Sequence, residues 1–224
     1  MREIVLDTET TGFDPLTGDR VVEIGCVELI NHIPSGQTFH RYINPERDMP
    51  AGAFAVHGLS EEFLRQHPVF AQVVEDLLAF IGGDPIIAHN ARFDMGFLNA
   101  EFSRAGLAPL PMERAIDTVG LARKKFPGAQ ASLDALCRRF GIDNSARTKH
   151  GALLDAELLA EVYLELIGGR QPDFALAVDQ VAVSATLVAG QAAVRPARAH
   201  APSTAELEAH AAFLKRLKEP IWLS

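Results

Sequence analysis

The chain has 224 residues, of which 48% are hydrophobic and 22% charged, and its formal net charge at pH 7 is −8. This much apolar sequence can bury a core, so the composition excludes a wholly disordered protein. The negative charge lies in the first 168 residues and argues against a broad basic surface that grips nucleic acid. If the chain meets a phosphate backbone, metal ions and a partner protein must supply much of the attraction.

No uninterrupted apolar run approaches the roughly 20 residues that span a bilayer, and no signal peptide is visible. The two cysteines, Cys26 and Cys137, lie far apart in apolar surroundings, which predicts buried free thiols. These features together predict a cytoplasmic protein with no membrane partner.

The first predicted element is a short apolar strand from Ile4 to Leu6, followed by Asp7, Glu9 and a hydroxyl-rich turn that ends at Gly12. Because alternate side chains of a strand share a face, the two carboxylates point the same way. Their mutual repulsion favours a bound divalent cation such as Mg²⁺ or Mn²⁺. A strand that runs out into an acidic, solvated turn explains the same residues equally well.

Strands and helices alternate along the rest of the first 169 residues. Two further strands are predicted at 20–30 and 37–43, across a turn at 34–36, and they complete an antiparallel meander. Ser60 is a helix N-cap. Helical spacing of apolar residues then predicts helices at 70–81, 92–105, 119–126, 132–140 and 152–167, with short strands at 85–88 and 115–116. This order predicts an α/β domain with a mixed central sheet flanked by helices.

The composition changes after Gly168-Gly169, where alanine and valine dominate and aromatic residues disappear. We therefore predict a domain over residues 1–169, a linker over 170–203 and a tail segment over 204–224. Ser203 and Thr204 are positioned to cap a short amphipathic helix in that segment. An apolar cluster so far from the core either folds back on the domain or docks in a partner's groove.

Two further carboxylates and a histidine stand beside predicted helix starts. Asp94 and Asp155 each lie one turn into a helix, and His150 lies just before the second of these helices. Taken alone, the acids are explained by the helix dipole and the histidine by an exposed loop. Taken with Asp7 and Glu9, the acids all lie at strand ends or helix starts, which gather at one rim of an α/β sheet. Four carboxylates in one pocket need about two divalent cations, beside which a histidine is a suitable general base.

Three motifs carry a family resemblance: Asp7-Thr-Glu9-Thr-Thr-Gly12, His89-Asn90-x-x-x-Asp94 and His150-x-x-x-x-Asp155. Together they resemble the three exonuclease motifs of the DEDD 3′–5′ exonucleases, and the His-x4-Asp form is that of the histidine subclass, DEDDh. Other stretches make residues 3–169 similar to the family of proofreading epsilon subunits of bacterial DNA polymerase III. They include Val56-His57-Gly58-Leu59, Ser132-Leu133-Asp134-Ala135-Leu136-Cys137 and Arg147-Thr148-x-His150-Gly151-Ala152.

This resemblance implies a ribonuclease-H-like exonuclease fold that removes mispaired 3′-terminal nucleotides from DNA. It implies that two divalent cations, Mg or Mn, are held by Asp7, Glu9, Asp94 and Asp155, and that His150 deprotonates the attacking water.

Contacts to the substrate follow from the same resemblance. His57 matches a family residue that contacts the terminal nucleotide, and Thr10, Gly12 and Asn90 are further expected contacts. Asp7, Glu9 and Asp155 are expected to meet the substrate as well as the metal.

The tail carries a second resemblance. Residues 171–176, with Gln171, Phe174 and Leu176, resemble the short peptide that docks on the sliding clamp, although Phe174 and Leu176 exchange their usual places. Residues 204–224 are positioned like the family's segment that binds the polymerase catalytic alpha subunit. The implied partners are therefore a single-stranded or frayed DNA 3′ end, the alpha subunit and the clamp. Two alternatives stay open, namely an RNA-trimming 3′–5′ exoribonuclease and a catalytically idle polymerase–clamp adaptor.

Overall fold

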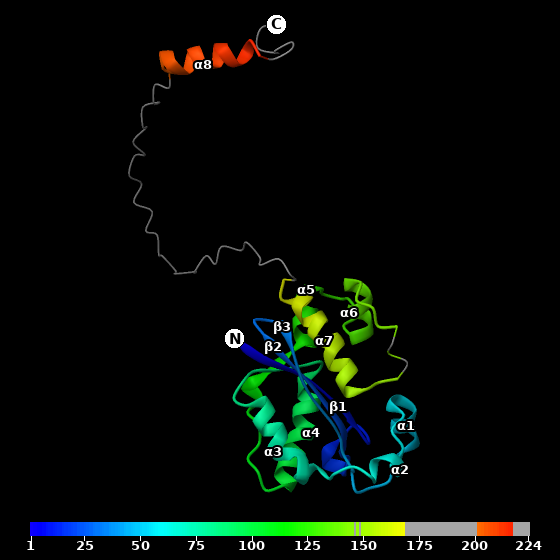
Figure 1. Ribbon diagram of the computed structural model, residues 1–224. Coiled ribbons are helices and arrows are strands. Elements are labelled where there is room, and N and C mark those ends of the chain that lie inside the picture. The colour runs from blue at the N-terminus through cyan, green and yellow to red at the C-terminus, as the bar shows by residue number, and fades with distance from the viewer. Residues whose placement is uncertain (146, 148, 169–200, 217–224) are drawn as a thin grey trace, which may run out of the picture. The chain divides into compact units, whose positions relative to one another are not determined.

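The computed structural model describes residues 1–145, 147, 149–168 and 201–216 (Figure 1). The chain divides into two units, residues 1–176 and 177–224, and the predicted clamp motif at 171–176 lies outside the described residues. In the second unit, helix α8 runs from Thr204 to Leu214. The predicted cap is present, because the Ser203 hydroxyl accepts from the Glu206 N–H while the Glu206 carboxylate accepts from the Ser203 N–H. Within the described ranges, no helix has the length and apolar character needed to cross a membrane.

A five-stranded mixed sheet forms the centre of the first unit, in the order β3-β2-β1-β4-β5. The strands are β1 (Arg2–Thr10), β2 (Val21–Ile30), β3 (Ile33–Tyr42), β4 (Ile86–Ala88) and β5 (Ala115–Asp117). β1 pairs antiparallel with β2 and parallel with β4, so it lies at the boundary between the two halves of the sheet. The predicted mixed sheet and its N-terminal meander are confirmed.

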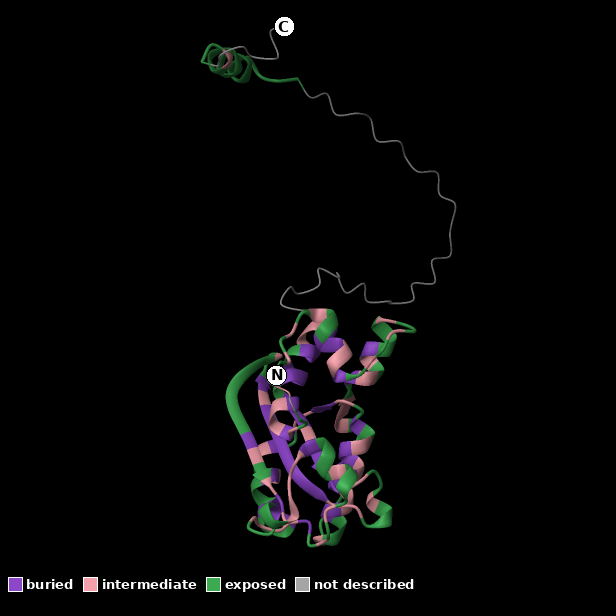
Figure 2. Ribbon diagram, turned by 90° about the vertical axis from the view of Figure 1, so that its right-hand side faces the viewer, coloured by how far each residue is buried: buried purple, intermediate pink, exposed green. Residues whose placement is uncertain are grey.

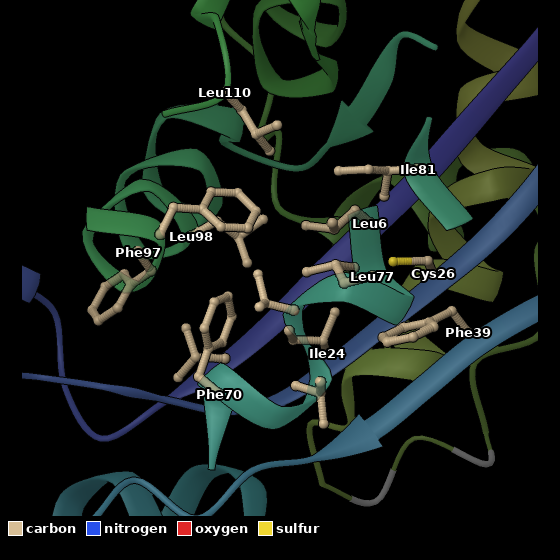
Figure 3. Close-up of a cluster of buried hydrophobic side chains, with 14 of the residues drawn as sticks. Leu6, Ile24, Cys26, Phe39, Phe70, Leu77, Ile81, Phe97, Leu98 and Leu110 are labelled. Carbon is tan, nitrogen blue, oxygen red and sulfur yellow. The ribbon is translucent and has the colours of Figure 1, made fainter. Parts of the chain in front are cut away.

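Helices cover both faces of this sheet, and each face has its own core. The helices are α1 (Ala51–His57), α2 (Glu61–Leu64), α3 (Phe70–Ile81), α4 (Ala91–Arg104), α5 (Thr118–Lys125), α6 (Leu133–Phe140) and α7 (Ala152–Leu166). One core joins the sheet to α3 and α4, and its side chains are drawn in Figure 3. The other joins the sheet to α5, α6 and α7, which lie side by side in Figure 1.

The alternation of side chains along β1 assigns residues to the two cores. Ile4 and Leu6 enter the α3–α4 core, whereas Val5 enters the core of α5 to α7. All three are fully buried, and Figure 2 shows the central strands as the buried part of the unit. Cys26 and Cys137 are buried free thiols, as predicted.

One prediction about local structure is wrong, and one helix was not predicted. The hairpin between β2 and β3 turns at Asn31 and His32, whose φ angles of 51° and 67° are left-handed, and not at 34–36. Residues 34–36 belong to β3, an edge strand in which the missing N–H of Pro34 costs no ladder hydrogen bond. Helix α1 was not predicted, because residues 51–57 include Gly52, expose most of their side chains and show no amphipathic spacing.

Candidate active site

The first two carboxylates lie inside β1 and not in a turn, because the strand continues to Thr10. By the alternation of the strand, Asp7 and Glu9 share the face of Val5, which is the face covered by α7. Asp155 lies in the first turn of α7 and is 2% exposed. The first motif, on β1, and the third motif, at the start of α7, therefore lie against each other.

A glycine on the neighbouring strand makes this meeting possible. Gly25 of β2 stands opposite Asp7 in the antiparallel register. A Cβ atom built on Gly25 would lie 2.3 Å from the carbonyl carbon of Ala152 and 2.3 Å from the nitrogen of Leu153. The backbone at the start of α7 therefore rests directly on β2, and this close approach brings Asp155 beside Asp7. No role was predicted for Gly25, although a glycine inside a strand pattern is a known signal of close backbone approach.

Asp94 reaches the same strand from the opposite side. It lies in the first turn of α4 and is 2% exposed. One of its oxygens, Oδ1, accepts hydrogen bonds from the Thr8 backbone N–H at 3.0 Å and from the Thr8 hydroxyl at 2.7 Å. α4 itself starts at Asn90, which has a left-handed φ of 70° and donates its backbone N–H to Asp117. β1 therefore positions carboxylates on both of its faces.

The five predicted catalytic residues line one cavity of about 770 Å³, together with Asn90. The five are Asp7, Glu9, Asp94, His150 and Asp155. Possible ligand atoms of Glu9, His150 and Asp155 lie within 4.8 Å of one another. The cavity is open on one side and is bordered by the loop between α5 and α6, residues 126–132.

Burial and mutual repulsion make these carboxyl groups hard to ionise in the absence of a cation. Burial, followed by the charges of Asp94 and Glu9, raises the pKa of Asp7 well above its usual range. Burial and the charge of Asp155 raise the pKa of Glu9 to about 8. Burial also raises the pKa of Asp94 to about 7. A set of hard oxygen donors that repel one another fits a divalent cation such as Mg²⁺ or Mn²⁺.

Arg147 is a site residue that was not predicted. Its guanidinium donates to both oxygens of Asp155, with Nη2 at 2.6 Å from Oδ2, and to Oδ1 of Asp134 at 2.8 Å. Burial opposes the ionisation of Asp155, but hydrogen bonds from His150 and Arg147 outweigh it and lower the pKa. Arg147 stands three residues before the histidine of the third motif, and only its place in that motif could have drawn attention to it.

The Nδ1 atom of His150 has two neighbours that demand opposite protonation states. Nη2 of Arg147 lies 2.8 Å away and can only donate, whereas Oδ2 of Asp155 lies 3.2 Å away and can only accept from an N–H. The ring is half exposed at the edge of the cavity. Which neighbour holds Nδ1 determines whether the other ring nitrogen, Nε2, is free to accept a proton.

A second cavity of about 490 Å³ adjoins the first, and Thr8, Glu9 and Phe93 line both. The predicted substrate contacts Thr10, Gly12 and His57 line this second cavity. The Thr10 hydroxyl donates to the Gly12 carbonyl at 2.6 Å.

His57 is 6% exposed at the end of α1. Its Nδ1 accepts from the Leu59 N–H at 3.0 Å, while Nε2 has no hydrogen-bond partner among the residues that the structure describes. Burial lowers the pKa of His57. The neutral ring therefore carries its proton on Nε2, and this N–H can donate a hydrogen bond.

Known proteins resemble the chain over most of its length. The sequence pattern of the exonuclease family RNase_T matches residues 4–163. The DNA polymerase III epsilon subunit of Rickettsia felis is 49% identical over 223 residues, which cover 97% of each chain. The chain belongs to the epsilon subunit family. The epsilon subunit of Escherichia coli K12 is 47% identical over 177 residues, which cover 75% of this chain and 72% of that one.

Solved structures agree with the epsilon assignment. Exonuclease X in complex with 5′ overhanging duplex DNA aligns with a TM-score of 0.57 at 26% identity, over 74% of this chain and 90% of that one. The nuclease domain of 3′hExo, a DEDDh family member bound to rAMP, aligns with a TM-score of 0.65 at 19% identity, over 74% and 91%. The second likeness shows the fold alone. With the epsilon relatives, these findings make the chain a 3′–5′ exonuclease associated with DNA polymerase III.

Proposed function

We propose that the chain removes mispaired 3′-terminal nucleotides from DNA during replication, by two-metal-ion hydrolysis of the terminal phosphodiester. The observation that carries this proposal is the meeting of four carboxylates and one histidine in a single cavity. The second cavity, with the buried ring of His57 on its wall, adjoins it and suits the terminal nucleoside.

The carboxylates Asp7, Glu9, Asp94 and Asp155 would hold two divalent cations, Mg or Mn. When bound, these cations would stabilise the negative charge on the attacking and leaving oxygens of the phosphodiester. The raised pKa values of Asp7, Glu9 and Asp94 support this role, since they arise in part from repulsion that a cation removes.

His150 would accept the proton of the attacking water at Nε2. This role requires that Nδ1–H donate to Asp155, because the neutral ring then keeps a lone pair on Nε2. Arg147 must release Nδ1 for this to happen, since a ring that accepts from Arg147 carries its proton on Nε2. Asp155 then serves as both a metal ligand and the group that orients the base.

Selection for a mispaired end follows from access to the two cavities. A terminal base that remains paired cannot enter the second cavity, whereas a frayed end supplies an unpaired strand at little cost. The Nε2–H of His57 would donate to the terminal nucleotide, and Thr10 and Gly12 would border it. Asn90, on the wall of the first cavity, would contact the adjoining nucleotide.

The test is digestion of a primer with one mismatched 3′ nucleotide, with Mg²⁺ or Mn²⁺, by the chain and by Asp7→Asn. The substitution keeps the size of the side chain and removes its charge, so we expect the rate to fall by about 10³-fold or more, in line with the loss of a metal ligand. Undiminished digestion by Asp7→Asn would contradict the metal assignment. A parallel digestion of single-stranded DNA and RNA of one sequence decides between proofreading and RNA trimming.

We further propose that the chain joins two replication proteins through its C-terminal part. Gln171, Phe174 and Leu176 would dock on the sliding clamp, and residues 204–224 would bind the polymerase alpha subunit. The relatives' name as subunits of DNA polymerase III supports a polymerase partner. Co-purification with the alpha subunit should be lost on truncation after Gly169, whereas exonuclease activity of residues 1–169 should persist. An intact complex after truncation would overturn the assignment of the tail.

A further inference from the structure

A third hollow of about 470 Å³ adjoins the catalytic cavity and shares no lining residue with the His57 cavity. It is lined by Arg138 and Arg139 of α6 and by Ala129 and Gln130 of the loop before α6. Ala129 and Gln130 also line the catalytic cavity. Since Thr8, Glu9 and Phe93 join the catalytic cavity to the His57 cavity, the three hollows form one continuous series.

The chemistry of the series changes from one end to the other. The His57 cavity exposes mostly apolar surface, the middle cavity carries the four carboxylates, and the third hollow carries guanidinium groups. Arg123 of α5 lines the middle cavity, together with Ala129 and Gln130, which the middle cavity shares with the third hollow. The groups of a nucleic acid strand follow the same order. A nucleoside at the 3′ end suits the apolar cavity, the scissile phosphate suits the carboxylate cavity with its cations, and the preceding phosphates suit the arginines.

The arginines of the third hollow are free to bind an anion. Within the described part of the chain, Arg123, Arg138 and Arg139 form no ion pair, whereas Arg20 and Arg147 are each held by buried carboxylates. All three are exposed. The guanidinium of Arg139 lies 4.5 Å above the centre of the Phe126 ring, which orders the group and leaves its N–H edge available.

Helix dipoles account for part of this pattern but not for all of it. Arg123 ends α5, and Arg138 and Arg139 end α6, where positive charge is favourable in any protein. The dipole does not require that the hollow lined by the end of α6 continue into a catalytic cavity, nor that Arg123 at the end of α5 line that same cavity. The chain as a whole has a net charge of −8, so these guanidiniums carry positive charge beside a cavity in an acidic protein.

We propose that the third hollow binds the phosphates of the single strand that precedes the reacting 3′ end, through Arg138 and Arg139, while Arg123 lines the adjoining catalytic cavity. This inference rests on the proposed function, because it places the terminal nucleoside in the His57 cavity and the scissile phosphate at the carboxylates. The rest of the strand then leaves the catalytic cavity through the third hollow, where Arg138 and Arg139 carry positive charge. The site recognises backbone and not bases, as proofreading of any sequence demands.

The test compares the full chain with the double variant Arg138→Gln/Arg139→Gln on single strands of 3 and 12 nucleotides that share one 3′ end. We expect KM for the 12-nucleotide strand to rise about 10-fold with kcat unchanged, and KM for the 3-nucleotide strand to change less than 2-fold. The slope of log(kcat/KM) against log[salt] should fall by about 1.4, since each phosphate contact to a single strand contributes about 0.7. Equal losses on both lengths, or an unchanged slope, would overturn the proposal.

A matched control is Arg41→Gln, because Arg41 also stacks on a phenylalanine, at 5.0 Å from the ring of Phe39, but lies on β3 outside the three hollows. Its KM and salt slope should stay at the wild-type values. Arg139→Lys keeps the charge and should retain most of the affinity, which a purely structural role of the Phe126 stack would not allow.

Equilibrium binding separates this proposal from the proposed function. The anisotropy of a labelled 12-nucleotide strand, measured in EDTA so that no turnover occurs, should report about 10-fold weaker binding by the double variant. If the chain shows no exonuclease activity, the proposed function fails. If the double variant still binds the strand more weakly than the unmodified chain in that case, the phosphate site is retained. Unchanged anisotropy combined with loss of a protein partner would instead assign the arginines to an acidic protein surface and overturn the proposal.

Discussion

Replacement of Gly25 by alanine should displace the start of α7 and impair both catalysis and stability. The new Cβ would lie 2.3 Å from the backbone of Ala152 and Leu153, whereas carbon atoms in contact lie about 3.5–4.0 Å apart. The position of the Cβ is fixed by the backbone of β2 and its neighbours are backbone atoms of α7, so no side-chain rotation relieves the contact and the helix must move away from β2 by about 1 Å. We expect a loss of about 1–3 kcal/mol in the free energy of unfolding. A 1 Å misplacement of Asp155 relative to Asp7 should lower the rate about 100-fold.

Two measurements with one control decide this prediction. Thermal unfolding followed by circular dichroism gives the change in stability, and digestion of a mismatched primer with Mn²⁺ gives the change in rate. Gly96→Ala is the control, because Gly96 lies inside α4 with open space around its Cβ position and alanine there should stabilise the helix by up to about 1 kcal/mol. A Gly25→Ala variant that digests the primer at the wild-type rate would refute the reasoning, whatever its melting temperature.

Three further predictions concern the charged groups of the cavity. Burial raises the pKa of Glu9 to about 8 and of Asp94 to about 7, so the folded chain binds more protons than the unfolded chain above about pH 4. The melting temperature of the metal-free chain should therefore decrease as the pH rises from 5 to 8, and Mn²⁺ should restore it. Calorimetry in EDTA and in Mn²⁺ measures both effects. A melting temperature that does not change with pH would contradict the burial of these acids. His150→Gln should lower kcat by about 10²–10⁴-fold with Mn²⁺ affinity retained in a calorimetric titration, and wild-type turnover would remove His150 as the base. Arg147→Gln should bind Mn²⁺ more tightly, because a cation that competes for Asp155 is lost, and weaker binding would show that Arg147 instead helps to shape the metal site.

The sequence predicted the parts of the site that depend on local periodicity. Asp7 and Glu9 share a face because they lie two residues apart on a strand, and this follows from the period of 2 alone. Asp94 and Asp155 lie in the first turns of α4 and α7, where the order of strands and helices placed them. Local pattern suffices here because each carboxylate is fixed to its own element, and the sheet topology then brings the elements together.

The sequence did not predict what depends on contacts between distant segments. The role of Gly25 becomes visible only when the backbone of α7 lies against β2. Arg147 lies outside regular structure, and its function is defined by its partners Asp134 and Asp155 and not by its spacing. The misplaced hairpin turn has a local cause, since Pro34-Ser35-Gly36 has stronger turn propensity than Asn31-His32. The sheet register, fixed by burial of β2 residues, overrides that propensity.

The position of β1 between the two cores explains why one strand can assemble a site from helices on opposite faces. Thr8 ties Asp94 of α4 to one side of β1 with two hydrogen bonds, and the bare backbone of Gly25 lets α7 bring Asp155 to the other side. When no cation is bound, the ionised carboxylates repel one another, and this repulsion tends to separate α4 from α7. The packing of the two cores against β1 opposes that separation. Arg147, which holds both oxygens of Asp155, already neutralises part of that force on the α7 side. Burial raises the pKa of Asp94 in spite of the two hydrogen bonds from Thr8, whereas the hydrogen bonds from His150 and Arg147 outweigh burial and lower the pKa of Asp155.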